Sequence, residues 1–197
     1  MNLCPSVNIF NNGVVSAVRI TENTTMAIPE MTRIGSARNA DTETMLDLST
    51  GTVLGNVKKL TANSRYEIKT PHGVAGIRGT DFQVTVTLEG VTTFTSVLGE
   101  VIVSAVINNV PVVKVLRTGE SWTPAPGTDV VPVPAPLLQQ MQKDATTVTT
   151  TVATAIATAT AAVTTPPTTK PAFSTGSTPS GNPSSSNGTP ATSPTSP

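Results

Sequence analysis

The sequence predicts an all-β domain followed by a C-terminal segment of different character. From Val7 to Trp122, apolar and polar residues alternate with a period of two, which is the pattern of half-buried strands. Turn residues interrupt the alternation roughly every nine to twelve residues, a spacing typical of a sandwich, a barrel or a β-solenoid. Apolar residues are mainly aliphatic, and aromatic residues make up only 3% of the chain. We therefore expect an irregular β-solenoid-like sandwich of short strands.

The first half of the domain is expected to contain a hairpin, a second turn and a half-buried strand. In NIFNNGVVSAVRI, residues 11–13 (Asn-Asn-Gly) separate two apolar runs, and Asn-Gly supplies the positive φ angles of a tight hairpin. In MLDLSTGTVLGNVKKL, residues 49–51 are turn residues between two further apolar runs. SRYEIKT then places Tyr66 and Ile68 on one strand face.

The second half continues the same rhythm. One face of the next strand carries four apolar residues, namely Phe82, Val84, Val86 and Leu88. Turns are expected at Glu89-Gly90 and at Gly99-Glu100, and VVKVLRTGESW supplies a last strand. The β domain is accordingly assigned to residues 3–126.

Prolines end the sheet after Trp122, since proline lacks the N–H group that strand pairing needs. Residues 127–136 are expected to form a Pro-rich linker. Residues 137–163 lack Pro and Gly and are rich in Ala and Thr, which favours a helix over a disordered stalk only weakly because Thr lowers helix propensity. Residues 164–197 consist largely of Pro, Thr, Ser, Gly and Asn, and we expect a disordered tail.

A membrane span and nucleic-acid binding are not expected. Residues 145–163 are uncharged over a length that could cross a bilayer, but they are mainly Thr and Ala rather than the residues that favour insertion. Twelve Lys and Arg balance twelve Asp and Glu, so there is no net positive charge to attract nucleic acid. One Cys (Cys4) and one His (His72) cannot form the usual zinc sets. Cys4 is interpreted as an incidental thiol, with lipid modification or intermolecular pairing as alternatives.

The segment TPHGVAGIRGTDF, residues 70–82, is the one stretch that resembles a site. A phosphate-binding loop would need a helix after the glycines, whereas a strand pattern follows here. His72 has no nucleophile with an orienting partner at a recognisable spacing, so we predict no catalytic, cofactor-binding or metal-binding residue and no enzyme. The segment is interpreted as a structural corner formed by Thr70, Pro71, Gly73, Gly76, Arg78, Gly79 and Thr80.

Within this corner, three residues carry specific expectations. Gly76 and Gly79 are expected to allow a backbone path or close approach that a Cβ would prevent, and Gly79→Val should be harmful if Gly79 has a positive φ. Arg78 is expected to be partly buried and to make several charge-assisted hydrogen bonds, so that Arg78→Ala would destabilise the domain.

These residues also resemble a known family. KTPHGVAGIRGTDFQVTV, followed by SVLGEVIVS and VLRTGESW, is similar to the FecR domain. The resemblance covers about residues 8–126 and is most specific at Thr70-Pro71 and residues 75–82. It implies a β-rich domain outside the cytoplasm, related to the periplasmic part of regulators that relay transporter occupancy to sigma factors.

The resemblance also shapes the expected function and location. The best-known members carry a sigma-binding segment and a transmembrane helix before this domain, and neither precedes it in this sequence, so sigma-factor signalling is not expected. We expect an export signal upstream of Met1, and hence a place in the periplasm or on the cell surface. The expected role is a non-catalytic binding or signalling module that contacts an envelope protein, such as a transporter or receptor. The alternative is a structural surface protein that binds copies of itself.

Overall fold

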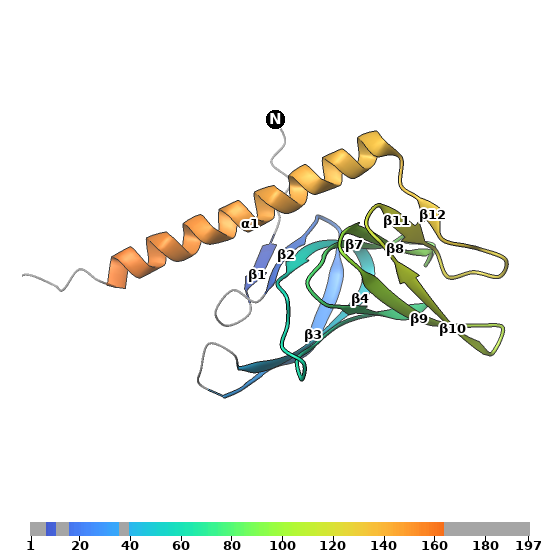
Figure 1. Cartoon of the computed structure of the whole chain (residues 1–197), viewed down its shortest axis with the longest axis horizontal. Helices are drawn as coiled ribbons and strands as arrows, with labels where there is room; N and C mark the ends of the chain where they lie inside the picture. Colours follow the sequence, from blue (N-terminus) through green and yellow to red (C-terminus); the bar gives the residue numbers. More distant parts are fainter. Residues whose placement is uncertain (1–6, 11–15, 36–39, 164–197) are drawn as a thin grey trace, which may run out of the picture. The chain divides into compact units, whose positions relative to one another are not determined.

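The computed structural model describes residues 7–10, 16–35 and 40–163. Strands dominate these residues, and a single long helix follows them (Figure 1). The elements are β1 (Val7–Phe10), β2 (Ser16–Ile20), β3 (Thr25–Ile34), β4 (Asp41–Val57), β5 (Arg65–Thr70), β6 (Gly73–Ile77), β7 (Asp81–Val86), β8 (Thr92–Leu98), β9 (Val101–Ile107), β10 (Val110–Leu116), β11 (Glu120–Trp122), β12 (Val131–Pro132) and α1 (Ala135–Val163). The predicted all-β class with a C-terminal helix is confirmed.

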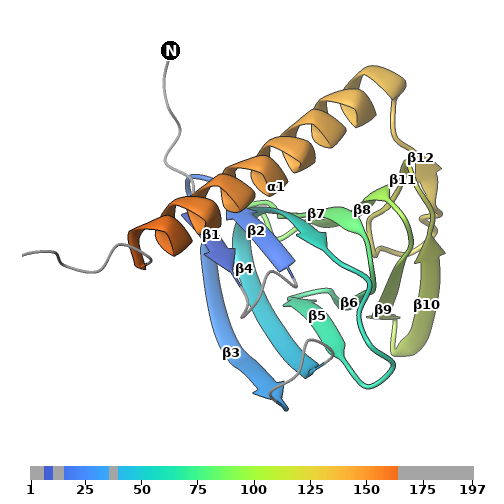
Figure 2. The same ribbon diagram turned by 60° about the vertical axis from the view of Figure 1, so that its left-hand side comes forward.

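The strands form one curled sheet with two halves. The main order is β10-β9-β6-β5-β4-β7-β8-β11-β12, with β3 added to β4 and the β1–β2 pair added through β2 (Figure 2). We call β3, β5, β6, β9 and β10 with the first part of β4 the β9 half, and the remaining strands with the last part of β4 the β8 half. Among the described strands only β4 and β5 pair in parallel.

The long strand β4 belongs to both halves. Its first part pairs with β3 and β5, and its last part pairs with β2 and β7. The change occurs near Gly51, which has a φ of 101° and lies so close to Thr24 that a Cβ would collide with it. The turn predicted at residues 49–51 is thus a bend within one strand, because glycine adopts this φ while pairing continues on either side.

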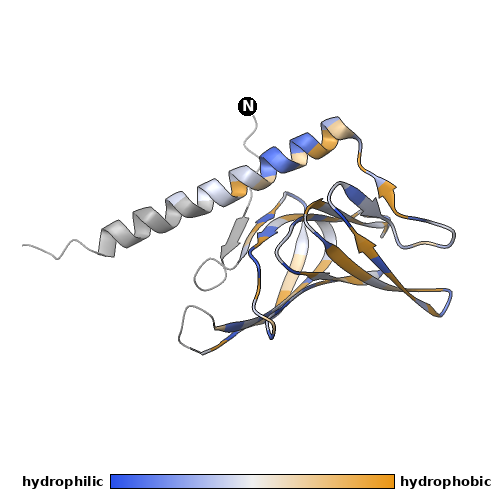
Figure 3. Cartoon of the chain, viewed as in Figure 1, coloured by the Kyte–Doolittle hydropathy of each residue, from blue (hydrophilic) through white to orange (hydrophobic). Residues whose placement is uncertain are grey.

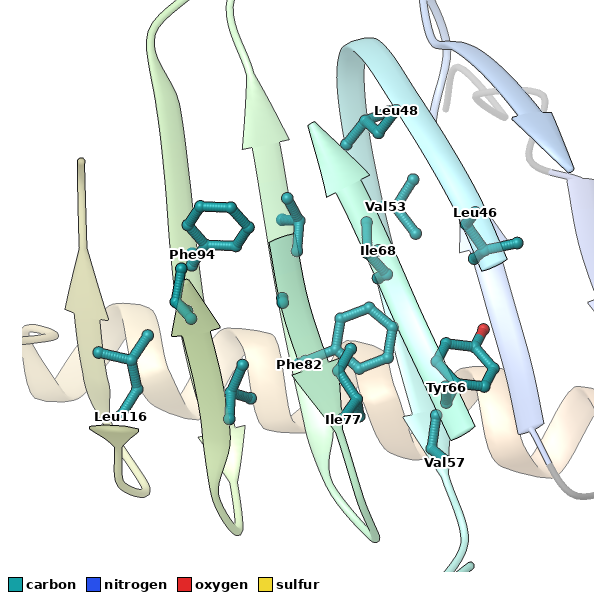
Figure 4. Packing of buried hydrophobic residues seen from close by; sticks show 14 of the residues in the cluster. Leu46, Leu48, Val53, Val57, Tyr66, Ile68, Ile77, Phe82, Phe94 and Leu116 are labelled. Atoms are coloured by element: carbon teal, nitrogen blue, oxygen red, sulfur yellow. The ribbon is translucent and has the colours of Figure 1, made fainter. Parts of the chain in front are cut away.

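The core lies between the two halves of the sheet. Large apolar side chains from both halves meet there, and Figure 4 labels Leu46, Leu48, Val53, Val57, Tyr66, Ile68, Ile77, Phe82, Phe94 and Leu116 among them. Each fully buried side chain of this size contributes about 1.5–3 kcal/mol. Tyr66 and Ile68 lie on one strand face, as predicted, and that face is buried. Leu88, however, lies beyond the end of β7 and is 87% exposed, so its predicted place on the buried face is wrong.

Helix α1 covers the outer face of the β8 half. Leu138, Met141 and Val148 pack against Ala17 of β2 and neighbouring residues of β4 and β8. Together with the buried Ala145, these helix residues recur at intervals of three and four, which places them on one side of the helix. The outer face of the β9 half has no such cover among the described residues (Figure 2).

The C-terminal elements differ in detail from the sequence expectations. The helix begins at Ala135, two residues before the expected start at 137, and β12 lies within the segment 127–136. Among the described residues, no helix has the length and apolar character that a bilayer span requires. The expected tail, residues 164–197, lies outside the described residues.

Candidate interaction surface

A groove of about 580 Å³ crosses the uncovered outer face of the β9 half. It lies over β5, β6 and β9, with Gly76 at its centre. Gly76 is paired with Glu67 on β5 and with Ile102 on β9. A Cβ at Gly76 would meet only the Ile102 carbonyl oxygen, at 3.8 Å, so the missing side chain leaves open space above the sheet. The groove is therefore a consequence of glycine at this outward-facing position.

One side of the groove is charged. Arg65 and Glu67 of β5 line it together with Arg78 and Glu100. Arg65 forms ion pairs with Glu43 at 3.9 Å and with Glu67 at 3.5 Å. These pairs are largely exposed, and exposed pairs contribute only about 0–1 kcal/mol to stability. Their main effect is to make this wall polar with little net charge.

An apolar surface lies beside the groove and adjoins it at Ile102. Ile102 and Val106 of β9 and Pro111, Val113 and Val115 of β10 point outward, and we call these five residues the β10 apolar patch. The register pairs Ile102 with Val115 and Val106 with Pro111, so the patch is contiguous across the hairpin. Val106 is 69% exposed and Val113 is 62% exposed. Figure 3 shows the apolar character of β9 and β10. Contiguous exposed apolar side chains are characteristic of interaction sites.

The first part of the TPHGVAGIRGTDF segment is the turn between β5 and β6. The buried Thr70 hydroxyl donates a hydrogen bond to the Gly73 carbonyl at 2.8 Å. A Cβ at Gly73 would lie 2.8 Å from the Ser104 carbonyl oxygen, so glycine permits the close approach of β6 to β9. Pro71 is exposed in the turn, and the His72 ring Nδ1 lies 3.3 Å from the Thr92 hydroxyl.

The second part of the segment forms a corner between β6 and β7. Gly79 has a φ of 74°, and a Cβ there would lie 3.2 Å from the Lys59 Cα. The buried Thr80 hydroxyl donates to the Glu100 carbonyl at 2.8 Å. The Thr80 carbonyl accepts a hydrogen bond from the Val57 N–H at 3.0 Å. Thr80 therefore links β4 to the turn before β9.

Two expectations for this segment are wrong. Arg78 is exposed, and its guanidinium donates to the Thr61 carbonyl at 3.3 Å rather than to several buried acceptors. A change of Arg78 to alanine is therefore expected to cost little stability, because a solvated guanidinium loses little on removal. Gly76 has neither a positive φ nor a close neighbour, so it is not needed for the backbone path. Both residues instead line the groove.

Burial and hydrogen bonding shift the pKa values of Tyr66 and Asp129. Burial raises the pKa of Tyr66, an effect that a hydrogen bond with the Ser16 side chain partly offsets. A hydrogen bond from the Lys114 ammonium group lowers the pKa of the Asp129 carboxyl, and the attraction between the two charges adds to this effect.

Within the described residues, no three His, Cys, Asp or Glu side chains lie together as metal ligands would. Cys4 lies outside those residues. The groove and the β10 apolar patch therefore offer a contact area that is polar on one side and apolar on the other.

Comparison with known proteins places the motif in a family. The sequence profile of the family described as FecR protein matches residues 11–101, which include the whole TPHGVAGIRGTDF segment. This region is a FecR domain. Proteins of this family are regulators rather than enzymes. β10 and α1 follow the matched region of the FecR domain.

Comparison with solved structures gives partial overlaps. Two crystal structures of a protein from Parabacteroides distasonis, provisionally described as an anti-sigma factor, overlap this chain with TM-scores of 0.49 and 0.46. Both are 14% identical to it, and the overlap covers 66% of this chain but only 56% of theirs. This chain thus spans a little over half the length of those proteins, and a likeness of this size does not show a shared partner. No curated protein sequence matches the chain.

The β10 apolar patch was not anticipated from the sequence. The signal for it is present, since VIVSAVI and VPVVKVL are apolar at both odd and even positions rather than alternating. Such runs are typical of strands buried on both faces. Here the inner face of the hairpin packs in the core while the outer face stays exposed.

Proposed function

We propose that the FecR domain is a non-catalytic protein-binding module of a signalling regulator, and that it binds through the uncovered outer face of the β9 half. The observation that carries this proposal is the β10 apolar patch beside the groove at Gly76. Helix α1 covers the opposite outer face, so exposed apolar side chains gather on the side that the helix leaves open. An apolar centre with a polar rim is the usual make-up of a protein-binding surface.

Site-specific photocrosslinking tests this function. A benzophenone amino acid at Ile102 lies on the groove, and a matched control at Thr147 lies on the exposed side of α1. We expect a light-dependent adduct with a distinct partner protein from position 102, none from position 147, and loss of the adduct when Val106→Lys is added. Equal adducts from both positions, or none from position 102, would contradict the proposed surface.

We further propose that the module works outside the cytoplasm, on the periplasmic side of the membrane or on the cell surface. The FecR family match and the Thr/Ser/Pro composition of residues 164–197 support this location. The test is protease accessibility of the chain produced from its own gene with all upstream sequence retained. Digestion in cells whose outer layers alone are permeabilised is expected, whereas protection until the inner membrane is lysed would argue against it.

A structural role as a self-associating surface protein is the second candidate. The specific observation in its favour is the position of β10 at the end of the sheet order, where its outer backbone groups are available to another strand. In the crosslinking experiment, an adduct between two copies of the chain would favour this role over recognition of a different protein.

A further inference from the structure

Strand β10 is a free edge of the sheet. It ends the strand order, and β9 is its strand partner among the described residues (Figure 2). An edge strand presents unpaired N–H and C=O groups to solvent and can accept another strand. Which groups it presents depends on how the β9–β10 hairpin is paired.

The turn of this hairpin determines which backbone groups face the open edge. Asn108 and Asn109 connect the strands and both have positive φ, 50° and 61°, as in a type I′ turn. The residues that flank such a two-residue turn, Ile107 and Val110, form a hydrogen-bonded pair, and such pairs alternate along the ladder. The N–H and C=O groups of Val112 and Lys114 therefore point to β9. Those of positions 111, 113 and 115 point away from it.

Pro111 occupies one of the outward positions. Proline has no N–H group, and in a sheet it is tolerated where that group would face solvent. The edge consequently offers donors at Val113 and Val115 and acceptors at all three outward positions. Pro111 removes a donor near the turn but leaves the centre of the edge intact.

We propose that β10 pairs with β10 of a second copy of this chain, antiparallel and centred on Val113. In this register the Val113 N–H and C=O groups of each copy bond to those of the other. Each Val115 N–H donates to the Pro111 carbonyl of the other copy, so the missing N–H of Pro111 costs only the reciprocal bond. Val113 also lies beside its counterpart, and Val115 lies beside Pro111 of the other copy, as apolar cross-strand neighbours.

Charge is compatible with this pairing. Lys114 is the only charged residue in the segment 101–116, and its ammonium group lies 2.7 Å from the Asp129 carboxylate. Asp129 is 84% exposed, and its carboxylate offsets the charge of Lys114 within each copy. Each copy thus brings a Lys114 whose charge is already paired, which reduces the repulsion that like charges would create.

The pairing is expected to be weak. A stable interface buries about 1,600 Å² in total, and a single short edge strand supplies less than that. Association should therefore depend on concentration. The inference rests on the second candidate function, self-association, and specifies the strand and the register that it uses.

A charge swap at position 113 tests both the pairing and its register. With the full chain, sedimentation velocity is measured from low micromolar to near-millimolar concentration. We expect the wild type to dimerise as concentration rises, Val113→Lys alone and Val113→Glu alone to stay monomeric, and an equal mixture of the two to dimerise again. The mixture is expected to dimerise because position 113 of one copy lies opposite position 113 of the other, so that opposite charges meet. Ile102→Thr, a change on the same face but away from the edge, should dimerise like the wild type.

Other results would overturn the inference. A wild type that stays monomeric throughout excludes the pairing, as does a Lys and Glu mixture that stays monomeric while each variant keeps wild-type fluorescence of Trp122. A third variant, Val113→Pro, removes an outward N–H donor and leaves the hydrogen bonds between β9 and β10 intact. Dimerisation of this variant at wild-type strength would therefore also exclude the proposed pairing. None of these outcomes bears on crosslinking of a different protein at Ile102, so the two proposals fail separately.

Discussion

At the level of single residues, glycines in the same motif have different roles. Gly79 has a positive φ and Lys59 lies close to it, whereas Gly76 has an ordinary φ and open space above it. The sequence indicates a corner at this motif because glycines cluster before a strand pattern. It does not distinguish a glycine required by the backbone from one that leaves a groove, since that depends on which strand lies opposite.

A pair of glycine substitutions tests this distinction. Gly79→Val should destabilise the domain by about 1–3 kcal/mol, because a β-branched side chain is strained at a positive φ. Gly76→Ala should change stability by less than about 0.5 kcal/mol, since the added methyl group meets no close neighbour. Urea unfolding followed by the fluorescence of Trp122, the only tryptophan, measures both changes. Equal effects of the two substitutions would contradict the assignment.

Tyr66 gives the domain a dependence on alkaline pH. Burial raises the pKa of its phenol above the ordinary value of 10.0, so the folded domain holds this proton more tightly than the unfolded chain does. Its contribution to stability is therefore constant below about pH 10 and is lost as the pH rises further.

The chain has a single tyrosine, so the ultraviolet absorbance of phenolate reports Tyr66 alone. Phenolate should appear together with unfolding rather than at the pH of a free phenol. The control, Tyr66→Phe, should lose less stability across the same pH range. Ionisation of Tyr66 near pH 10 in a folded domain would show that the phenol is solvated.

At the level of elements, the sequence predicts the strands well and their connections less well. Period-two alternation identifies β5 and β7, because each has one face in the core and one face outward. The bend in β4 was interpreted as a turn, since a glycine between two apolar runs has the same local pattern in both cases. The contact between α1 and the sheet depends on long-range packing, which local alternation does not report.

Substitution on α1 tests that contact. Met141→Ala should destabilise the domain by about 2 kcal/mol or more, because Met141 is buried against the β8 half and its loss leaves a cavity. Thr147→Ala, on the exposed side of the same helix, should stay within about 0.5 kcal/mol of the wild type. Thermal unfolding monitored by circular dichroism provides the comparison. A helix that does not pack on the sheet would make the two variants alike.

At the level of the whole molecule, the two outer faces of the sheet differ. Helix α1 covers the outer face of the β8 half, while the outer face of the β9 half carries a groove, an apolar patch and a free edge strand. The family resemblance seen in the sequence agrees with the matched FecR domain, but β10 follows the matched residues. The TPHGVAGIRGTDF motif therefore indicates the family, and the folded chain indicates which face of the sheet is available for binding.

The central claim is that β10 is an open edge of this available face, and residue-resolved amide exchange by NMR tests it most directly. In dilute protein, the N–H groups of Val112 and Lys114 should exchange slowly because they bond to β9. Those of Val113 and Val115 should exchange fast because they face solvent, and they should become protected as concentration rises. Slow exchange of Val113 and Val115 in dilute monomer, equal to that of Val112 and Lys114, would show that the edge is already covered and would contradict the claim.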